Sequence, residues 1–179
     1  MATTRRQKRI VYLIAALGGL VPVLVLTGTL KVYSIPSSNG EPTLMPGDRI
    51  FVTRDFGRSH QRGDLVVFDS PSSPGSKFIQ RVVAVPGDLI EVIDGHLAVN
   101  GTLLESPTGL NSRPAPPQAS LRYKVPSYPL TVPQDAVFVL GDNFENSLDS
   151  RYFGCVPTDA ITHTPRFRVH PLSRAGSLD

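Results

Sequence analysis

Side chains that commonly bind metals or form covalent cross-links are few and scattered in this sequence. Cys155 is the only cysteine, so the chain cannot form an internal disulfide. The four histidines fall at intervals that match no metal-ligand spacing. We therefore predict no metal site and no cofactor, and we expect surface or structural roles for His60, His96, His163 and His170.

The basic residues precede a long apolar run and are not spread evenly over the chain. The first 31 residues carry five bases and no acid, whereas the remaining residues carry 13 bases and 15 acids. A nucleic-acid-binding surface needs basic residues distributed over a folded domain. We therefore exclude nucleic acid as a partner.

The apolar run Ile10–Leu30 contains no charged residue and is long enough to cross a membrane as one helix. Its 21 residues would span about 32 Å, which matches the hydrocarbon core of a bilayer. The basic cluster in residues 1–9 predicts a cytoplasmic N-terminus, with residues 31–179 across the membrane. A cleaved signal peptide is the alternative, although its apolar region usually has only about 7–15 residues.

Residues 31–179 have the composition of a mainly β domain. The chain holds 17 prolines and 15 glycines, which weigh against a helical bundle and favour short strands joined by irregular loops. Asp94-Gly95, between Leu89–Ile93 and Leu97–Val99, is typical of a tight hairpin turn. Residues 105–134 contain seven prolines, so we expect an extended surface insertion there. Further β-branched and aromatic runs predict strands at 48–54, 63–69, 77–85, 136–140 and 166–169.

Four segments resemble, in the expected order, type I signal peptidases, the membrane-bound serine proteases that remove signal peptides from exported proteins. These segments are Tyr33–Leu44 with Gly47-Asp48, Arg62–Phe68, Lys77–Val83 with Pro86-Gly87-Asp88, and Gly141–Gly154. The resemblance extends from about Tyr33 to Leu172. It implies a single N-terminal transmembrane helix followed by an antiparallel β-sheet domain that lies against the outer membrane face.

Two positions depart from the family pattern, and both would carry its chemistry. The resemblance places the nucleophilic serine at Asn39 and the general-base lysine at Gln80, while Gly40 replaces a methionine. A serine hydroxyl needs an adjacent base, and lysine serves as that base only when burial leaves its amine neutral. An amide performs neither task near pH 7. Loss of a nucleophile or base can lower turnover by about 10⁶.

A relocated pair formed by Ser38 and Lys77 is an alternative source of activity. In a regular strand Lys77 and Gln80 point to opposite faces, because side chains alternate. We therefore expect Ser38 to be a loop serine and Lys77 to be a solvated cation. We also expect the amides of Asn39 and Gln80 to lie within hydrogen-bonding reach or to share one water, which spares about 1–3 kcal/mol for each buried polar group.

The residues that support catalysis in the family are retained. Ser37 matches the oxyanion-hole serine, and Ser147 matches the serine that orients the lysine. Asp149 and Arg151 match a supporting ion pair, whose main role here would be to brace its loop. The resemblance also implies pockets that receive small side chains of the substrate, and Gly40 should reduce one wall of them. The residues that match the pocket lining could equally be ordinary core residues: Tyr33, Ile35, Leu44, Phe78 and Ile79.

The leading hypothesis is a catalytically inactive signal-peptidase-like protein whose cleft binds an extended peptide, such as a signal peptide, or a membrane-protein partner. One alternative is an active signal peptidase I with non-standard residues. Another is a structural subunit of a larger membrane-protein complex. The segment after Pro171 looks like cyanobacterial members of the family, which suggests a bacterial plasma membrane or thylakoid membrane with the domain in the periplasm or lumen.

Overall fold

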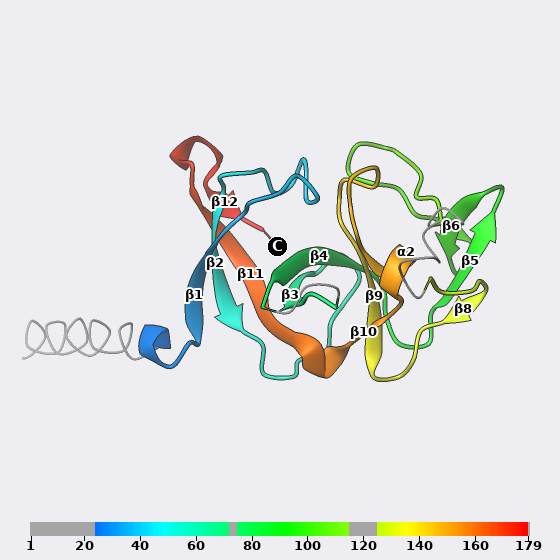
Figure 1. Cartoon of the computed structure of the whole chain (residues 1–179), viewed down its shortest axis with the longest axis horizontal. Coiled ribbons are helices and arrows are strands. Elements are labelled where there is room, and N and C mark those ends of the chain that lie inside the picture. The colour runs from blue at the N-terminus through cyan, green and yellow to red at the C-terminus, as the bar shows by residue number, and fades with distance from the viewer. Residues whose placement is uncertain (1–23, 72–74, 115–124, 179) are drawn as a thin grey trace, which may run out of the picture.

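A computed structural model describes residues 24–71, 75–114 and 125–178, which form two antiparallel sheets (Figure 1). The larger sheet has the strand order β1-β2-β11-β3-β4-β9-β10, with β12 paired to β11, and the smaller sheet has the order β7-β6-β5-β8. The larger sheet consists of β1 (Leu30–Ser34), β2 (Arg49–Arg54), β3 (Leu65–Asp69), β4 (Lys77–Ala84), β9 (Ala136–Leu140), β10 (Val156–Pro157), β11 (Ile161–His170) and β12 (Gly176–Ser177). The smaller sheet consists of β5 (Leu89–Ile93), β6 (His96–Val99), β7 (Thr102–Leu103) and β8 (Leu130–Thr131). The prediction of a mainly antiparallel β domain is confirmed.

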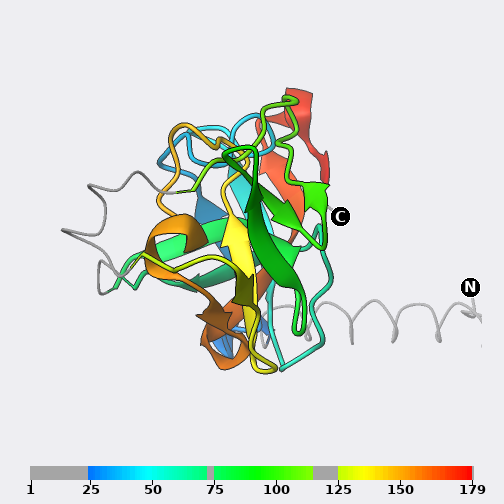
Figure 2. The ribbon, with the colours of Figure 1, turned by 90° about the vertical axis from the view of Figure 1, so that its right-hand side faces the viewer.

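Three short helical segments follow β9 in the described part of the chain. They are the α-helix α2 (Ser150–Phe153) and the 3-10 helices η2 (Thr158–Ala160) and η3 (Leu172–Arg174). Viewed from the side of the smaller sheet, β5, β6 and β8 lie in front of the larger sheet (Figure 2). The region that the resemblance implicates in chemistry belongs to the larger sheet and its loops.

The predicted hairpin is confirmed in the smaller sheet. Asp94 and Gly95 have φ angles of 50° and 77°, and the register pairs Ile93 with His96. Positive φ at both central residues is the geometry of a two-residue type I′ turn, whose twist matches that of the flanking strands.

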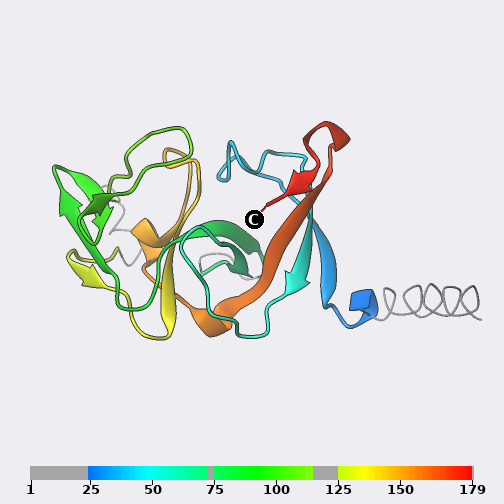
Figure 3. The ribbon, with the colours of Figure 1, turned by 180° about the vertical axis from the view of Figure 1, so that it is seen from behind.

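The strand β11 is longer than the sequence predicted, because it begins at Ile161 and not at Arg166. Pro165 lies inside this strand, although proline normally breaks the ladder of a central strand. Here β3 pairs with β11 only at Ile161 and His163, and the register toward β2 shifts just after Pro165. The N–H that Pro165 lacks is therefore missing at a point where the hydrogen-bond ladder of β11 is already interrupted. Figure 3 shows β11 from behind, running beside β2 along the larger sheet.

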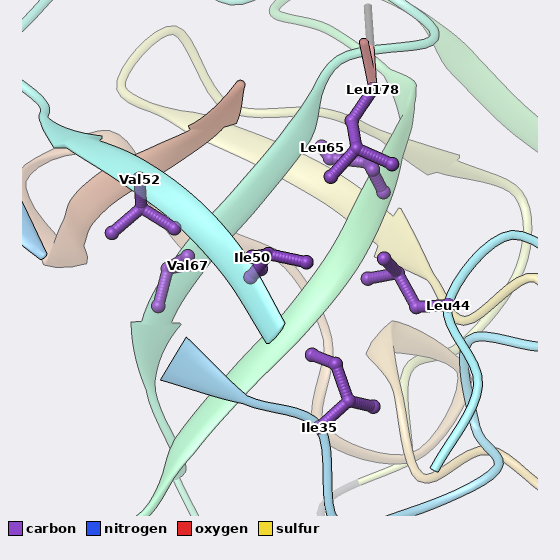
Figure 4. Close-up of a cluster of buried hydrophobic side chains, with 7 residues drawn as sticks. All are labelled: Ile35, Leu44, Ile50, Val52, Leu65, Val67 and Leu178. Carbon is purple, nitrogen blue, oxygen red and sulfur yellow. The ribbon is translucent and has the colours of Figure 1, made fainter. Parts of the chain in front are cut away.

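The buried side chains form three clusters, of which one lies beneath β1, β2 and β3. It joins Ile50 and Val52, which alternate along β2, to residues from three other segments (Figure 4). Its remaining buried members are Ile35, Leu44, Leu65, Val67 and Leu178. A second cluster lies around β9 and α2, and a third packs the smaller sheet against β4 and β9 through Ile90, Leu97, Val132, Phe138 and Leu140, among others.

The predicted membrane-spanning run lies mostly outside the described residues. Residues 24–26 are helical, Gly28 has a positive φ of 70°, and β1 starts at Leu30. The last residue assigned to the apolar helix therefore belongs to a strand. Within the described ranges, no helix has the length and apolarity needed to cross a bilayer.

The proline-rich segment 105–134 is described only at its two ends, since residues 115–124 lie outside the described residues. Both ends are tied to the smaller sheet. Leu97 N–H donates to Ser112 O, and Leu130–Thr131 pairs with β5. Val132 is 1% exposed in the third cluster. The described ends are therefore anchored to the smaller sheet, although more than half of their residues are exposed, and the surface insertion itself stays a prediction.

Candidate peptide-binding cleft

A cleft of about 840 Å³ opens between the end of β1 and the start of β4. It is lined by residues 33–37, 39–40 and 44 and by residues 76–79. Residues 145–148 and Tyr152 complete the lining. The five apolar residues that the sequence assigned to substrate pockets all line it: Tyr33, Ile35, Leu44, Phe78 and Ile79.

The apolar walls of the cleft are braced by packing behind them. The ring of Tyr33 meets His163 edge to face, with ring centroids 5.7 Å apart. Phe78 packs in the same way against Phe68 at 5.9 Å. Burial lowers the pKa of His163, so its ring stays neutral beside Tyr33 near pH 7. The walls are therefore fixed by the fold and offer a mostly apolar surface.

Asn39 and Gln80 do not hydrogen-bond to each other as the sequence analysis expected. Asn39 Oδ1 accepts from the hydroxyl of Ser37 at 2.7 Å. Gln80, which is 1% exposed, donates from Nε2 to the carbonyl of Leu148 at 2.7 Å. Its Oε1 has no hydrogen-bond partner within the described residues. A direct bond between the two amides is therefore absent, because Asn39 Oδ1 and Gln80 Nε2 each bond to another group. The alternative of one shared water stays a prediction.

The hydroxyl of Ser38 and the amine of Lys77 are engaged with different partners. Ser38 Oγ accepts from Asn146 Nδ2 at 2.7 Å. Lys77 Nζ lies 2.6 Å from Asp69 Oδ1 on the neighbouring strand β3. Lys77 is exposed whereas Gln80 is buried, which agrees with the predicted alternation along β4. These contacts supply no base to Ser38, although Lys77 does line the cleft.

Asp149 and Arg151 form the buried ion pair that the sequence predicted. Two hydrogen bonds of 2.8 Å join the guanidinium to the carboxylate, and the residues are 0% and 5% exposed. Asp149 also caps α2 through Arg151 N–H and accepts from Gly141 N–H at 3.3 Å. The guanidinium lies over the ring of Phe144 at 5.6 Å. The pair therefore braces the 141–151 loop, which is the role we expected of it.

Ser147 lines the cleft, but its hydroxyl oxygen is buried and lacks the hydrogen bonds that the Asp149–Arg151 pair makes. Ser147 is 8% exposed, and its Oγ has no partner within the described residues. Gly141 lies directly against it, since a Cβ at position 141 would stand 2.3 Å from Ser147 Oγ and 2.5 Å from the carbonyl oxygen of Asn39. Glycine is thus the only residue that fits between these two groups without a shift.

Several residues that fix the site were not singled out from the sequence. Asn143 fixes the backbone of residues 38 and 39. Its N–H donates to Asn39 O at 3.0 Å, and its side chain donates to Ser38 O at 3.1 Å. Arg81 pairs with Asp142 through two bonds of 2.8 and 2.7 Å, which raise the pKa of the Arg81 guanidinium. All three lie inside the segments that carry the family resemblance, so the signal was present.

Gly40 does not leave one wall of the cleft open. It is buried, and a Cβ at this position would lie 3.0 Å from Cβ of Leu44. Leu44 is 2% exposed and belongs to the cluster beneath β1 and β2. The expected gap is therefore filled by Leu44, which packs against the backbone of residue 40.

Comparison with known proteins agrees with this geometry. The family described as "Signal peptidase, peptidase S26" matches residues 6–170. Probable signal peptidase I-2 of Synechocystis is 37% identical over 166 residues, which cover 89% of this chain and 72% of the relative. Probable signal peptidase I-1 of the same organism is 38% identical over 173 residues, covering 89% and 83%. Thylakoidal processing peptidase 1 of Arabidopsis thaliana is 34% identical over 166 residues, covering 86% and 46%.

Proposed function

This chain belongs to the signal peptidase family, peptidase S26, and from that premise we propose that it binds an extended, signal-peptide-like segment without cleaving it. The observation that carries the proposal is the state of positions 39 and 80. The family resemblance places the nucleophile and base there, and both positions hold amides that are bonded to neighbouring protein groups.

Hydrolysis would require a hydroxyl with a base within about 2.6–3.2 Å. Neither amide can serve, because a carboxamide has no titratable lone pair near pH 7. The hydroxyl of Ser37 donates to Asn39 Oδ1, so the hydroxyl that would stabilise an oxyanion is also occupied. Ser38 and Lys77 are bonded to Asn146 and Asp69 instead of to each other. Within the described residues, the contacts of positions 38, 39, 77 and 80 therefore place no proton acceptor beside a nucleophile.

Binding needs only the apolar walls and a strand edge, and both features are present. β9 pairs with β4 only from Arg81 onward, which leaves residues 77–80 without a ladder partner on the side of β9. A peptide that pairs with such an edge places alternate side chains in the cleft and gains main-chain hydrogen bonds. Tyr33, Ile35 and Ile79 would then receive its small apolar side chains.

A membrane is part of the proposal. We infer that the apolar run beginning at Ile10 anchors the chain, because it is uncharged throughout and follows the basic residues 1–9. The β domain would then lie on the periplasmic or lumenal side, which agrees with relatives described as bacterial signal peptidases and thylakoidal processing peptidases. A larger membrane-protein complex is the alternative setting, and no contact in the described residues favours it.

The test uses the full chain in detergent micelles with a fluorescent synthetic signal peptide. Mass spectrometry should show no cleaved product under conditions in which an active signal peptidase I converts the peptide completely. Fluorescence anisotropy should show saturable binding. Ile79→Lys, on a cleft wall, should raise Kd about ten-fold or more, because it introduces a charge into an apolar site.

Val92→Lys is the matched control, because Val92 is 42% exposed on β5 in the smaller sheet and lines no part of the cleft. It should leave Kd unchanged. Product formation that disappears in Ser38→Ala would overturn the proposal in favour of an active peptidase with a relocated nucleophile. Equal effects of the two lysine variants would show that binding lies outside the cleft.

A further inference from the structure

The last described residues of the chain return to the loop that carries the cleft. We call residues 171–178 the hook and residues 35–48 the cleft loop. After β11 the hook turns through η3, and β12 pairs Gly176 and Ser177 with Arg168 and Phe167. We propose that the hook positions the cleft loop, so that peptide binding depends on Arg174 and Leu178 although neither residue lines the cleft. The dependence on peptide rests on the function proposed above.

The first contact is ionic and centres on Asp48, at the end of the cleft loop. Asp48 is 1% exposed, and its carboxylate accepts from Met45 N–H at 2.9 Å. Arg174 Nη1 lies 3.2 Å from Asp48 Oδ1, and Arg168 Nη1 lies 3.4 Å from Asp48 Oδ2. A buried carboxylate requires such partners, so Asp48 ties the loop to the hook.

The same two arginines also bind the backbone of the cleft loop. Arg174 Nη2 donates to Pro42 O at 3.1 Å, and Arg168 Nη1 donates to Thr43 O at 2.9 Å. Arg168 Nε in turn donates to the carbonyl of Arg174 at 2.7 Å, which fixes the hook on β11. These carbonyls lie between Gly40 and Leu44, both of which line the cleft. The guanidinium groups therefore hold the segment that forms one cleft wall.

The second contact is apolar. Leu178 is 8% exposed and shares a buried cluster with Ile35 and Leu44, the two cleft-loop residues whose side chains form the wall (Figure 4). Leu178 N–H donates to Arg166 O at 2.9 Å, so its position is fixed by the backbone of β11. The hook thus supports the cleft loop from behind through both packing and hydrogen bonds.

The chain contains a matched turn that lacks the hook. Met45–Asp48 and Val85–Asp88 both have the sequence Pro-Gly-Asp after an apolar residue, with φ of 88° at Gly47 and 86° at Gly87. In each turn the aspartate accepts from the N–H three residues earlier, at 2.9 and 2.8 Å. Asp88 takes its arginine from Arg62, which touches no cleft residue among the bonds described. Arg62→Gln therefore removes an equivalent ion pair away from the cleft loop.

The experiment compares Arg174→Gln with Arg62→Gln in the full chain, using the signal-peptide probe and amide hydrogen exchange. Arg174→Gln should raise the Kd of the peptide about ten-fold and accelerate exchange across residues 38–48, because it removes bonds to Asp48 and Pro42. Arg62→Gln should accelerate exchange near residues 85–89 and leave Kd within about two-fold. Arg174→Lys should give an intermediate Kd, because one ammonium replaces the charge but not the forked geometry.

Leu178→Ala provides a second route if Arg174→Gln does not fold, and it should raise Kd while leaving the ion pairs in place. Equal changes of Kd in Arg174→Gln and Arg62→Gln would overturn the proposal, as would faster exchange of the cleft loop with an unchanged Kd. If the wild-type chain binds no peptide, the proposed function fails separately. Amide hydrogen exchange of residues 38–48 then decides whether the hook holds the cleft loop. An exchange rate that is the same in Arg174→Gln and in wild type would refute that the hook holds this loop.

Discussion

Gly141→Ala is expected to destabilise the protein and weaken peptide binding, because Gly141 separates the Asn39 backbone from Ser147. A Cβ at position 141 would stand 2.3 Å from Ser147 Oγ, 2.8 Å from Ser147 Cβ and 2.5 Å from Asn39 O. The Ser147 hydroxyl could rotate away, but its Cβ and the Asn39 carbonyl could not. The carbonyl is held in place by Asn143 N–H at 3.0 Å.

The loss of stability in Gly141→Ala can be worked out from the groups that the added Cβ would displace. Overpacking of a closely packed site costs about 1–3 kcal/mol, and displacing the Asn39 carbonyl from Asn143 loses a hydrogen bond that contributes about 1 kcal/mol. We therefore expect the free energy of unfolding to fall by about 2–4 kcal/mol. Because Asn39 lines the cleft, the same displacement should raise the Kd of the peptide.

Two other glycines make the prediction a graded series. A Cβ at Gly40 would meet Leu44 Cβ at 3.0 Å, a contact that a backbone shift of a few tenths of an ångström relieves. A Cβ at Gly176 would meet nothing within 4 Å, and neither glycine has a positive φ. Urea unfolding should therefore rank the alanine variants Gly176, Gly40 and Gly141 in order of increasing loss. A loss below about 0.5 kcal/mol for Gly141→Ala, which is typical of surface substitutions, would refute the reasoning from close contact.

Two further predictions concern the chemistry and the pH dependence of the same region. Asn39→Ser with Gln80→Lys should cleave the signal peptide about 10²-fold faster or more than either single variant, measured by product formation, because nucleophile and base act as a unit; a double variant no faster than the singles would show that the frame no longer supports catalysis. Burial lowers the pKa of His163 below its ordinary 6.5. Between the lowered pKa and 6.5 the unfolded chain therefore binds more protons than the folded chain. The free energy of unfolding should accordingly decrease as the pH falls below 6.5. In urea unfolding, the free energy of unfolding of His163→Gln should decline less between pH 7.5 and 5 than that of wild type. His170→Gln, which changes an exposed histidine, should follow wild type. Identical slopes for both variants would contradict a role of His163 in the pH dependence.

The elements that the sequence predicted well are those whose pattern is local. Residues 49–54, 65–69 and 136–140 are dense in β-branched and aromatic side chains, and each forms a strand close to its predicted bounds. Asp94-Gly95 specifies its own turn geometry, and the φ angles follow it. Local propensity and burial agree in these segments, so no tertiary information was needed.

The elements that the sequence missed depend on partners far away in the chain. β1 follows directly on an apolar run, and only its pairing with β2 shows that Leu30 belongs to a strand. β8 and β12 have two residues each, too short for any periodicity. Arg174 reaches Asp48 across 126 positions of sequence. No spacing rule connects two such residues, so the hook could not be predicted.

In the candidate site, too, the sequence predicted the positions of residues but not their contacts with distant segments. Positions 39 and 80 were found through the family segments around them, whereas their actual bonding partners were not predicted. The two amides were expected to bond directly or through one water, but Asn39 Oδ1 accepts from Ser37 and Gln80 Nε2 donates to the Leu148 carbonyl. Hydrogen bonds form with the nearest suitable group, and which group is nearest is set by loop conformation and not by residue type.

The retained supporting residues are therefore no argument for retained catalysis. Asp149 caps α2, accepts the Gly141 N–H and neutralises Arg151, all in a buried setting. Removing one member of a buried ion pair costs about 3–5 kcal/mol, because the remaining charge is left without compensation. The fold alone would thus favour both residues whether or not the cleft is catalytic. Ser147 Oγ and Gln80 Oε1 are two buried polar atoms of this region without a hydrogen-bond partner within the described residues. The ion pair therefore reports on the stability of the 141–151 loop and not on activity.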